Sequence, residues 1–213
     1  MMGEDLETAQ VEASGLVGDR VYAFVDKNSP NPRFPWMTAR QAHEMLLYKP
    51  SLSDSGLAVK CPDGKKFWVE DEEFKTYLEK KYGYELFLKQ DKKSHCFDSK
   101  PISLIGLETI KLLGKETQMA LDHTRFRANF YIEFQKEPYY EDTMLNKTLK
   151  IGEVQIKIVK KDSRCVIPSL DPQSSKESPV VLQMIQKHHG GCTGVYATVE
   201  RQGSVRVGDA VRI

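Results

Sequence analysis

The 213-residue sequence has no long hydrophobic run, no paired cysteine motif and no excess of charge of either sign. Its apolar runs span a handful of residues, far below the roughly 20 that a membrane helix needs. The N-terminal stretch MMGEDLETAQ is acidic, whereas a secretory signal is basic and then apolar. We therefore expect a soluble intracellular protein without a membrane segment, cytoplasmic or, if the native N-terminus is missing, mitochondrial.

Charge is balanced along the chain. The 31 Lys and Arg residues face 30 Asp and Glu residues, which gives a net charge of +1. This balance supplies no broad attraction for a polyanion, so nucleic acid is not expected as a partner. A bound anion should be small and held by a local cluster of arginines, because the guanidinium fork matches phosphate and carboxylate.

The four cysteines, Cys61, Cys96, Cys165 and Cys192, are unevenly spaced and form no C-x-x-C pair. This spacing argues against a zinc knuckle or an iron–sulfur loop. Each is expected to be a free thiol in a reducing compartment. The sequence also has no fingerprint of a dinucleotide-binding site. If the protein carries out a redox reaction, the electrons must therefore come from an external partner.

The first part of the chain, residues 1–95, predicts a small α/β lobe. Its expected elements are a strand around Val21 to Val25, a short helix within 37–48 with Thr38 as N-cap and Gln41 completing a capping box, a hairpin turning at Asp63 and Gly64, a surface helix over 72–81, and a strand with Leu86 and Leu88.

The remainder, residues 96–213, predicts a β-barrel or strongly curved sheet, so the fold class is α+β. Repeated alternation surrounds turns at Gly152-Glu153, Gln202-Gly203 and Gly208-Asp209. Two helices interrupt the strands. One is expected to stop at Gly114, and the other covers roughly 178–188.

Arginines lie near several predicted element ends, in the stretches GDR (Arg20), TAR (Arg40), RFRAN (Arg125, Arg127, Asn129) and DSRC (Arg164). A single surface arginine is usually only solvated, but this set together with Cys165 at a strand-to-loop junction indicates an anionic ligand with a soft centre. Arg164 would favour the thiolate of Cys165. Alternatively, Cys165, before Val166 and Ile167, is a small hydrophobe that ends a buried strand. The residues alone leave both interpretations open.

The segments GLVGDRVYAFVDK, MTARQ, RFRANFYIE, LKIGEVQIKIVKKDSRCVIPSLDP and GSVRVGDAVRI, in this order, resemble the MOSC domain family, named for the C-terminal part of molybdenum cofactor sulfurase. They are most similar to the branch that includes the mitochondrial amidoxime-reducing component. The resemblance runs from about Val11 to the C-terminus. It implies a MOSC-type β-barrel with a smaller N-terminal α/β lobe and a bound molybdenum cofactor, a pterin dithiolene with a terminal phosphate.

The resemblance also implies roles for individual residues. Cys165 would be the thiolate ligand of molybdenum, Ser163 and Arg164 would hold the pterin, Arg20, Arg40, Arg127 and Asn129 would complete the cofactor-binding set, and Asp98 would relay protons. The implied activity is reduction of N-hydroxylated small molecules such as amidoximes and hydroxylamines. The electrons would come from a separate haem protein and flavoprotein, or from a fused iron–sulfur domain.

Two features depart from the family pattern. No opening strand with a Pro-x-Lys-Ser type loop is evident, and Lys100 stands where that branch commonly has a small hydroxyl residue. These departures keep two alternatives in view, a non-catalytic carrier of the cofactor or its sulfur through a Cys165 persulfide, and a binding module without catalysis.

Two further stretches carry weaker hypotheses. HHGGC places His188, His189 and Cys192 close together, a possible zinc or copper site with Cys165. Adjacent helical histidines point about 100° apart, which makes this site a minor alternative. EPYYEDTM reads as a loop that caps the barrel, in which Asp142 has a possible role facing the substrate.

Overall fold

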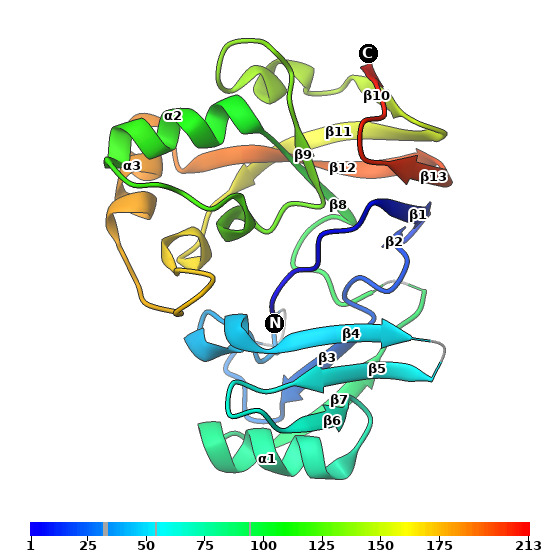
Figure 1. Cartoon of the computed structure of the whole chain (residues 1–213), viewed down its shortest axis with the longest axis vertical. Coiled ribbons are helices and arrows are strands. Elements are labelled where there is room, and N and C mark those ends of the chain that lie inside the picture. The colour runs from blue at the N-terminus through cyan, green and yellow to red at the C-terminus, as the bar shows by residue number, and fades with distance from the viewer. Residues whose placement is uncertain (32–33, 54, 94) are drawn as a thin grey trace. The chain divides into compact units, whose positions relative to one another are not determined.

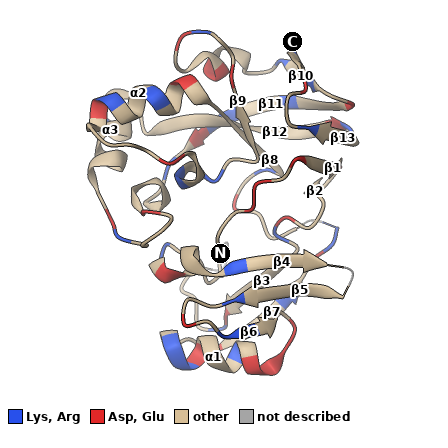
Figure 2. Cartoon of the chain, in the orientation of Figure 1, with Lys and Arg blue, Asp and Glu red and all other residues tan. Residues whose placement is uncertain are grey.

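The computed structural model describes residues 1–31, 34–53, 55–93 and 95–213, which form two compact units (Figure 1). Unit 1 comprises Met1–Glu4, Arg20–Asp98 and Pro172–Lys176, and unit 2 comprises Asp5–Asp19, Ser99–Asp171 and Glu177–Ile213. Basic and acidic residues are interspersed along the ribbon of both units (Figure 2). Within the described ranges, no helix is long and apolar enough to cross a membrane.

Unit 1 is built from two small antiparallel sheets and one α-helix. One sheet pairs β3 (Tyr22–Asp26) with β7 (Leu86–Gln90), the other has the order β4 (Lys49–Ser53), β5 (Gly56–Lys60), β6 (Lys66–Trp68), and the helix is α1 (Glu72–Tyr82). The ring of Phe74 on α1 lies 5.4 Å from Phe24, edge-on, and 5.4 Å from Phe67, stacked. This aromatic contact joins the helix to both sheets. The predicted hairpin, surface helix and flanking strands are confirmed.

The short helix predicted within 37–48 is confirmed only in part. Gln41 does take up the capping position, since the Thr38 hydroxyl lies 2.9 Å from the Gln41 side-chain oxygen and the Ala42 amide donates to the Thr38 carbonyl. The chain then forms only a short 3-10 helix, η1 (His43–Leu47). Residue Pro50 follows inside β4, an edge strand, where its missing N–H costs no ladder bond. The sheet thus begins directly after the predicted helix stretch, at Lys49.

Unit 2 contains a curled six-stranded sheet that forms a half-barrel (Figure 1). Its order is β14 (Val211–Arg212), β10 (Thr148–Ile151), β11 (Val154–Ser163), β12 (Cys192–Arg201), β8 (Ile102–Gly106), β9 (Phe130–Ile132), and a second, three-stranded sheet has the order β13 (Gly203–Arg206), β1 (Thr8–Glu12), β2 (Gly15–Leu16). Only the β8–β9 pairing is parallel among the described strand pairs. The α+β fold class and the curved sheet are confirmed.

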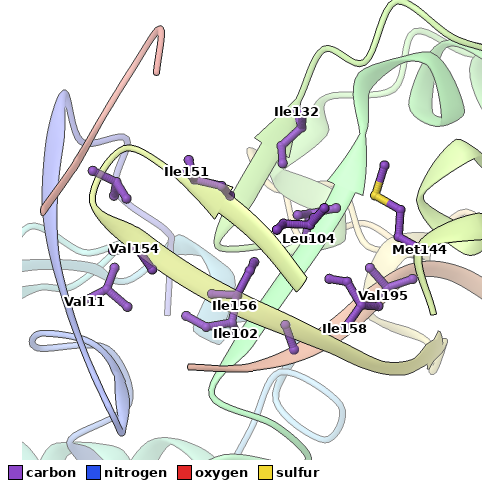
Figure 3. Packing of buried hydrophobic residues seen from close by; sticks show 13 residues of the cluster. Val11, Ile102, Leu104, Ile132, Met144, Ile151, Val154, Ile156, Ile158 and Val195 are labelled. Atoms are coloured by element: carbon purple, nitrogen blue, oxygen red, sulfur yellow. The ribbon is translucent and has the colours of Figure 1, made fainter. Parts of the chain in front are cut away.

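The core of unit 2 lies where the two sheets meet, and Figure 3 shows its packing. Val154, Ile156 and Ile158 alternate along β11 and are fully buried. Val11 from β1 contributes to the same cluster. This two-residue period is the one that predicted the strand, and burying each such side chain stabilises the fold by roughly 1.5 to 3 kcal/mol.

Two helices of unit 2, α2 (Leu107–Thr117) and α3 (Val180–His188), pack against each other over a second cluster. Ile105 belongs to this cluster, whereas Ile102 and Leu104 belong to the first, so β8 is buried on both faces. This is why ISLIG reads as a continuous apolar run with no alternation.

The prediction that α2 stops at Gly114 is wrong, because the helix continues to Thr117. Gln118 takes the left-handed conformation at the cap, with φ of 54°, and the Met119 amide donates to the Gly114 carbonyl at 3.0 Å. A Cβ on Gly114 would lie 3.0 Å from the Met119 carbonyl oxygen. Gly114 thus leaves room for the chain where it folds back over the end of the helix. The helix itself ends about one turn after Gly114.

A buried carboxylate holds the start of α2. Glu141, in the 3-10 helix η3 (Tyr140–Met144), accepts hydrogen bonds from the Gly106 amide at 3.2 Å and the Thr109 hydroxyl at 3.1 Å. Its side chain supplies acceptors at a helix N-terminus that has no cap of its own. Burial raises the pKa of Glu141, although these two hydrogen bonds oppose the rise.

We predict that Glu141→Gln changes the pH dependence of stability. Because the folded pKa of Glu141 is raised, its contribution is fully present below the unfolded value of about 4.5 and is lost as pH rises through the folded value. Glutamine stays neutral. The free energy of unfolding of the variant should therefore rise relative to that of the wild type as the pH increases, by about 1.4 kcal/mol for each unit by which the pKa of Glu141 is raised. Urea unfolding at a series of pH values measures this gain. The exposed Glu137→Gln variant, which also removes one carboxylate, is measured alongside as the control.

Candidate functional site

Cys165 lies directly beyond the end of β11, in a segment that we call the cysteine segment, Asp162–Asp171. All four cysteines are free thiols, as expected. Burial raises the pKa of the Cys61 and Cys96 thiols, which makes them poor nucleophiles and poor ligands. Cys165 and Cys192 are only half-buried. Cys165 is therefore not sealed in the core, and it is one of two half-buried cysteines.

The side chain of Arg164 points into unit 2 and is almost fully buried. Its Nη1 lies 2.9 Å from a carboxylate oxygen of Asp162 and 2.8 Å from the Phe126 carbonyl oxygen, to which it donates. Its Nε donates to the Thr193 carbonyl oxygen at 2.8 Å. The side chains of Arg164 and Asp162 are 9% and 5% exposed, so this ion pair is shielded from water. The geometry gives Arg164 a structural role beside Cys165.

A bulge in β12 makes this arrangement possible. Lys161 pairs with Val195 and Ser163 with Cys192, so Asp162 faces two residues, Thr193 and Gly194, on the neighbouring strand. Gly194 has a φ of 79°, and a Cβ there would lie 2.7 Å from the Leu104 carbonyl oxygen and 3.4 Å from Nη2 of Arg164. The irregularity leaves the Thr193 carbonyl free of the regular ladder for Arg164.

Asn129 joins three parts of unit 2. Its side-chain oxygen accepts from the Ser103 amide at 2.9 Å and lies 3.0 Å from the Ser103 hydroxyl. Its side-chain amide donates to Asp19 at 3.0 Å. Asn129 thereby ties β8 to the GDR stretch at the start of the chain, which explains how residues 110 apart come to lie side by side.

Arg127 and Arg20, both predicted cofactor contacts, share an unusual backbone. Their φ angles are 51° and 53°, in the left-handed region that residues with a Cβ seldom adopt. Such strain costs roughly 1 kcal/mol or more and concentrates at functional sites. The guanidinium of Arg20 also lies 5.7 Å from the ring centre of Phe97.

The predicted site residues divide between the two units. Arg20, Arg40 and Asp98 belong to unit 1, where Arg40 and Asp98 form an ion pair with each other. In unit 2, Ser163 is exposed on β11, opposite Cys192, and is followed directly by Arg164 and Cys165, while Arg127 and Asn129 follow the 3-10 helix η2 (His123–Phe126). The structure thus brings together Arg40 with Asp98, and Arg164 with the carbonyl that precedes Arg127.

His189 and Asp142, the residues of the two weaker hypotheses, each contact another protein side chain. His189 lies 2.7 Å from Glu116 and stacks on the ring of Tyr139 at 4.4 Å. Asp142 forms an ion pair with Lys161 at 2.7 Å, and the EPYYEDTM stretch contains η3. Among the residues that the structure describes, no group of three His, Cys, Asp or Glu side chains is placed to hold a metal ion.

Sequence reasoning missed Asp162, Ser103 and Asp171. These residues contact Arg164, Asn129 and Arg125, respectively, and hold them in position. Asp162 carried a usable signal. Along β11 the buried positions Val154, Ile156 and Ile158 are even-numbered, and Asp162 continues the same face, although Lys160 interrupts it. An acid on the inward face, two residues before an arginine, indicates a buried ion pair.

The fold is shared with a solved structure, that of the YUAD protein from Bacillus subtilis. The likeness covers 98% of this chain and 85% of that one, with a TM-score of 0.53 and 13% sequence identity. The family model of the MOSC domain matches residues 91–212, more than half of the chain. The chain belongs to the MOSC domain family.

Two curated proteins are similar in sequence. "Molybdenum cofactor sulfurase" of Caenorhabditis briggsae is 28% identical over 131 residues, which cover 58% of this chain and 18% of that protein. "Mitochondrial amidoxime reducing component 2" of Rattus norvegicus is 32% identical over 129 residues, which cover 54% of this chain and 37% of that protein. The matches thus span well under half the length of either relative.

The residues of this chain suit a metal that brings most of its own ligands. The described part of the chain offers no cluster of metal-binding side chains, but it offers Cys165, a half-buried free cysteine just beyond the end of β11. A soft thiolate suits a redox metal held mainly by dithiolene sulfurs. The donor set therefore fits the molybdenum cofactor and does not fit an ion bound by protein side chains alone.

Proposed function

We propose that this protein binds the molybdenum cofactor through Cys165 and reduces N-hydroxylated small molecules. What carries the proposal is the position of Cys165, a half-buried thiol fixed by a buried arginine inside the region that matches the MOSC domain. The similarity to the amidoxime reducing component supports this substrate class. When bound, the cofactor supplies a two-electron redox centre.

The chain itself supplies the cofactor's protein ligand and its supports. Cys165 provides one thiolate, and Arg164 holds the backbone on which that thiolate sits. We assign Ser163, Arg127, Asn129, Arg20 and Arg40 to binding the pterin and its phosphate, and Asp98 to moving protons. Reducing an amidoxime to an amidine consumes two electrons and two protons, breaks the N–O bond and releases water. A separate electron-donor protein must provide the electrons.

The reductase activity can be tested with a simple substrate and a chemical reductant. Protein purified from a host that makes the cofactor is mixed with benzamidoxime and a reduced viologen dye, and benzamidine is measured by chromatography. We expect benzamidine to form only with both protein and reductant. Absence of product from protein that carries stoichiometric molybdenum would reject the reductase and leave the cofactor site standing.

A carrier function is the second candidate, and the similarity to molybdenum cofactor sulfurase favours it. In that case Cys165 would carry a persulfide, and the chain would pass on cofactor or sulfur without reducing a substrate. Sulfane sulfur released from the purified protein by cyanide, in the absence of molybdenum, would support this function. A reductase would instead contain molybdenum and would release no sulfane sulfur with cyanide.

A further inference from the structure

Two buried arginines connect η2 and the cysteine segment in opposite directions. From η2, Arg125 reaches the segment, with Nη2 at 2.7 Å from Asp171 Oδ2 and Nη1 donating to the Pro168 carbonyl oxygen at 3.4 Å. From the segment, Arg164 reaches back and donates to the carbonyl oxygen of Phe126. Each element therefore sends one guanidinium into the other, and the contacts lie on both sides of Cys165.

This arrangement is costly for folding. The Arg125 side chain is 4% exposed, its Nε is buried with no partner among the described residues, and Asp171 shields its charge on one side only. Well-packed apolar side chains usually stabilise a buried position as well as an ion pair does. A pair of buried guanidinium groups is better explained by the geometry they impose, because their rigid forks fix direction as well as distance.

The part of the segment between these contacts is a short turn held by both local and long-range contacts. After Cys165 the backbone turns through η4 (Ile167–Ser169), with the Ser169 amide donating to the Val166 carbonyl at 2.8 Å and the Leu170 amide to the Ile167 carbonyl at 3.0 Å. Both bonds lie within the turn and do not tie it to the rest of unit 2, so they should open more often once its long-range contacts are lost. Those contacts are the bonds of Arg125, the Ser169 hydroxyl, which accepts from the Leu182 amide of α3 at 3.2 Å, the Ser169 carbonyl, which accepts from the Ser178 amide at 2.8 Å, and the buried side chain of Leu170.

We propose that Arg125 is a positioning residue, which acts with Arg164 as a reciprocal clamp that fixes the Cys165 sulfur relative to η2. Arg127 and Asn129 follow η2 directly, so the clamp also sets the spacing between the thiol and these two predicted cofactor contacts. This inference rests on the proposed function only for the identity of the group that the Cys165 sulfur binds. The clamp itself is a property of the chain without any ligand.

The test compares Arg125→Met, Arg125→Lys and Asp171→Asn in the full chain by amide hydrogen exchange and by maleimide labelling of cysteines. Losing the charge-assisted bond to Asp171 should speed exchange at Ser169 and Leu170 by about tenfold to a hundredfold. Cys165 should be labelled faster by a similar factor in Arg125→Met, with a smaller change in Arg125→Lys. Strand β10 and Cys192 should keep their wild-type rates. Lys161→Met, which breaks an exposed ion pair near the same strand end, is the matched control and should change neither rate.

An unchanged rate at Ser169, Leu170 and Cys165 in the Met variant would overturn the clamp. Equal acceleration throughout unit 2 would also overturn it, because that is the result of a general loss of stability. If Arg125→Met does not fold, Asp171→Asn decides the question, since it keeps the arginine and removes only its charged partner. No readout requires molybdenum, so the clamp can fail while the cofactor site stands, or the reverse.

Discussion

Cys165→Ser is expected to lower both bound molybdenum and amidoxime reduction by more than about 100-fold. Mutating groups that merely support a metal's ligands costs 10 to 100-fold, so losing the protein ligand itself should cost more. A serine hydroxyl is a hard, weakly acidic donor and replaces the soft thiolate poorly. The fold should survive, because Cys165 is only half-buried and belongs to neither of the two hydrophobic clusters described in unit 2.

Cys192→Ser provides the matched control. Cys192 is also free and half-buried, and it begins the strand that pairs with Ser163. Its substitution should leave molybdenum content and activity within about twofold of wild type, since surface changes of this kind are nearly neutral. Equal molybdenum in Cys165→Ser and Cys192→Ser would remove Cys165 from the site.

Asp162→Asn is expected to destabilise the fold by about 3 to 5 kcal/mol, because it leaves the buried guanidinium of Arg164 without its counter-charge. Urea unfolding followed by far-ultraviolet circular dichroism measures this loss. Molybdenum retention should fall with it, since the residue that precedes Cys165 then loses its anchor.

An exposed pair in the same region serves as the comparison. Asp142→Asn breaks the ion pair to Lys161, whose side chains are 21% and 45% exposed, and should cost only about 0 to 1 kcal/mol. A cost for Asp162→Asn as small as that for Asp142→Asn would mean that Arg164 is solvated. The structural role assigned to Arg164 would then be wrong.

Much of the fold follows from local patterns in the sequence. Val154, Ile156 and Ile158 alternate because one face of β11 is buried, and Asp63-Gly64 gives the turn that the β5–β6 hairpin needs. Such signals lie within a few residues of the element they specify. The helices α1 and α3 were predictable for the same reason.

The errors occurred where distant contacts decide. Residues 37–48 carry a helix cap, yet they form only the 3-10 helix η1, and β4 begins directly afterwards at Lys49 and pairs with β5. Strand β1 went unpredicted because TAQVE has a single buried side chain, Val11, and gains its hydrogen bonds from β13 near the other end of the chain. Pairing between such remote segments leaves little trace in either one.

The candidate site shows the same division. The sequence marks Cys165 and its neighbouring arginines as a group, but it does not show where each side chain points. The direction of Arg164 depends on the bulge at Thr193 and Gly194 and on Asp162, features of strands that meet only in the folded sheet. Local sequence therefore identifies the residues, and only the sheet register separates those that could bind a ligand from those that hold the segment in place.

The most direct test is the molybdenum content of the wild-type protein. The chain is purified from a host that makes the cofactor, and molybdenum is measured by mass spectrometry against protein concentration, together with the pterin released on denaturation. The account predicts about one molybdenum and one pterin per chain, both lost in Cys165→Ser. Protein that folds normally and retains neither would contradict it.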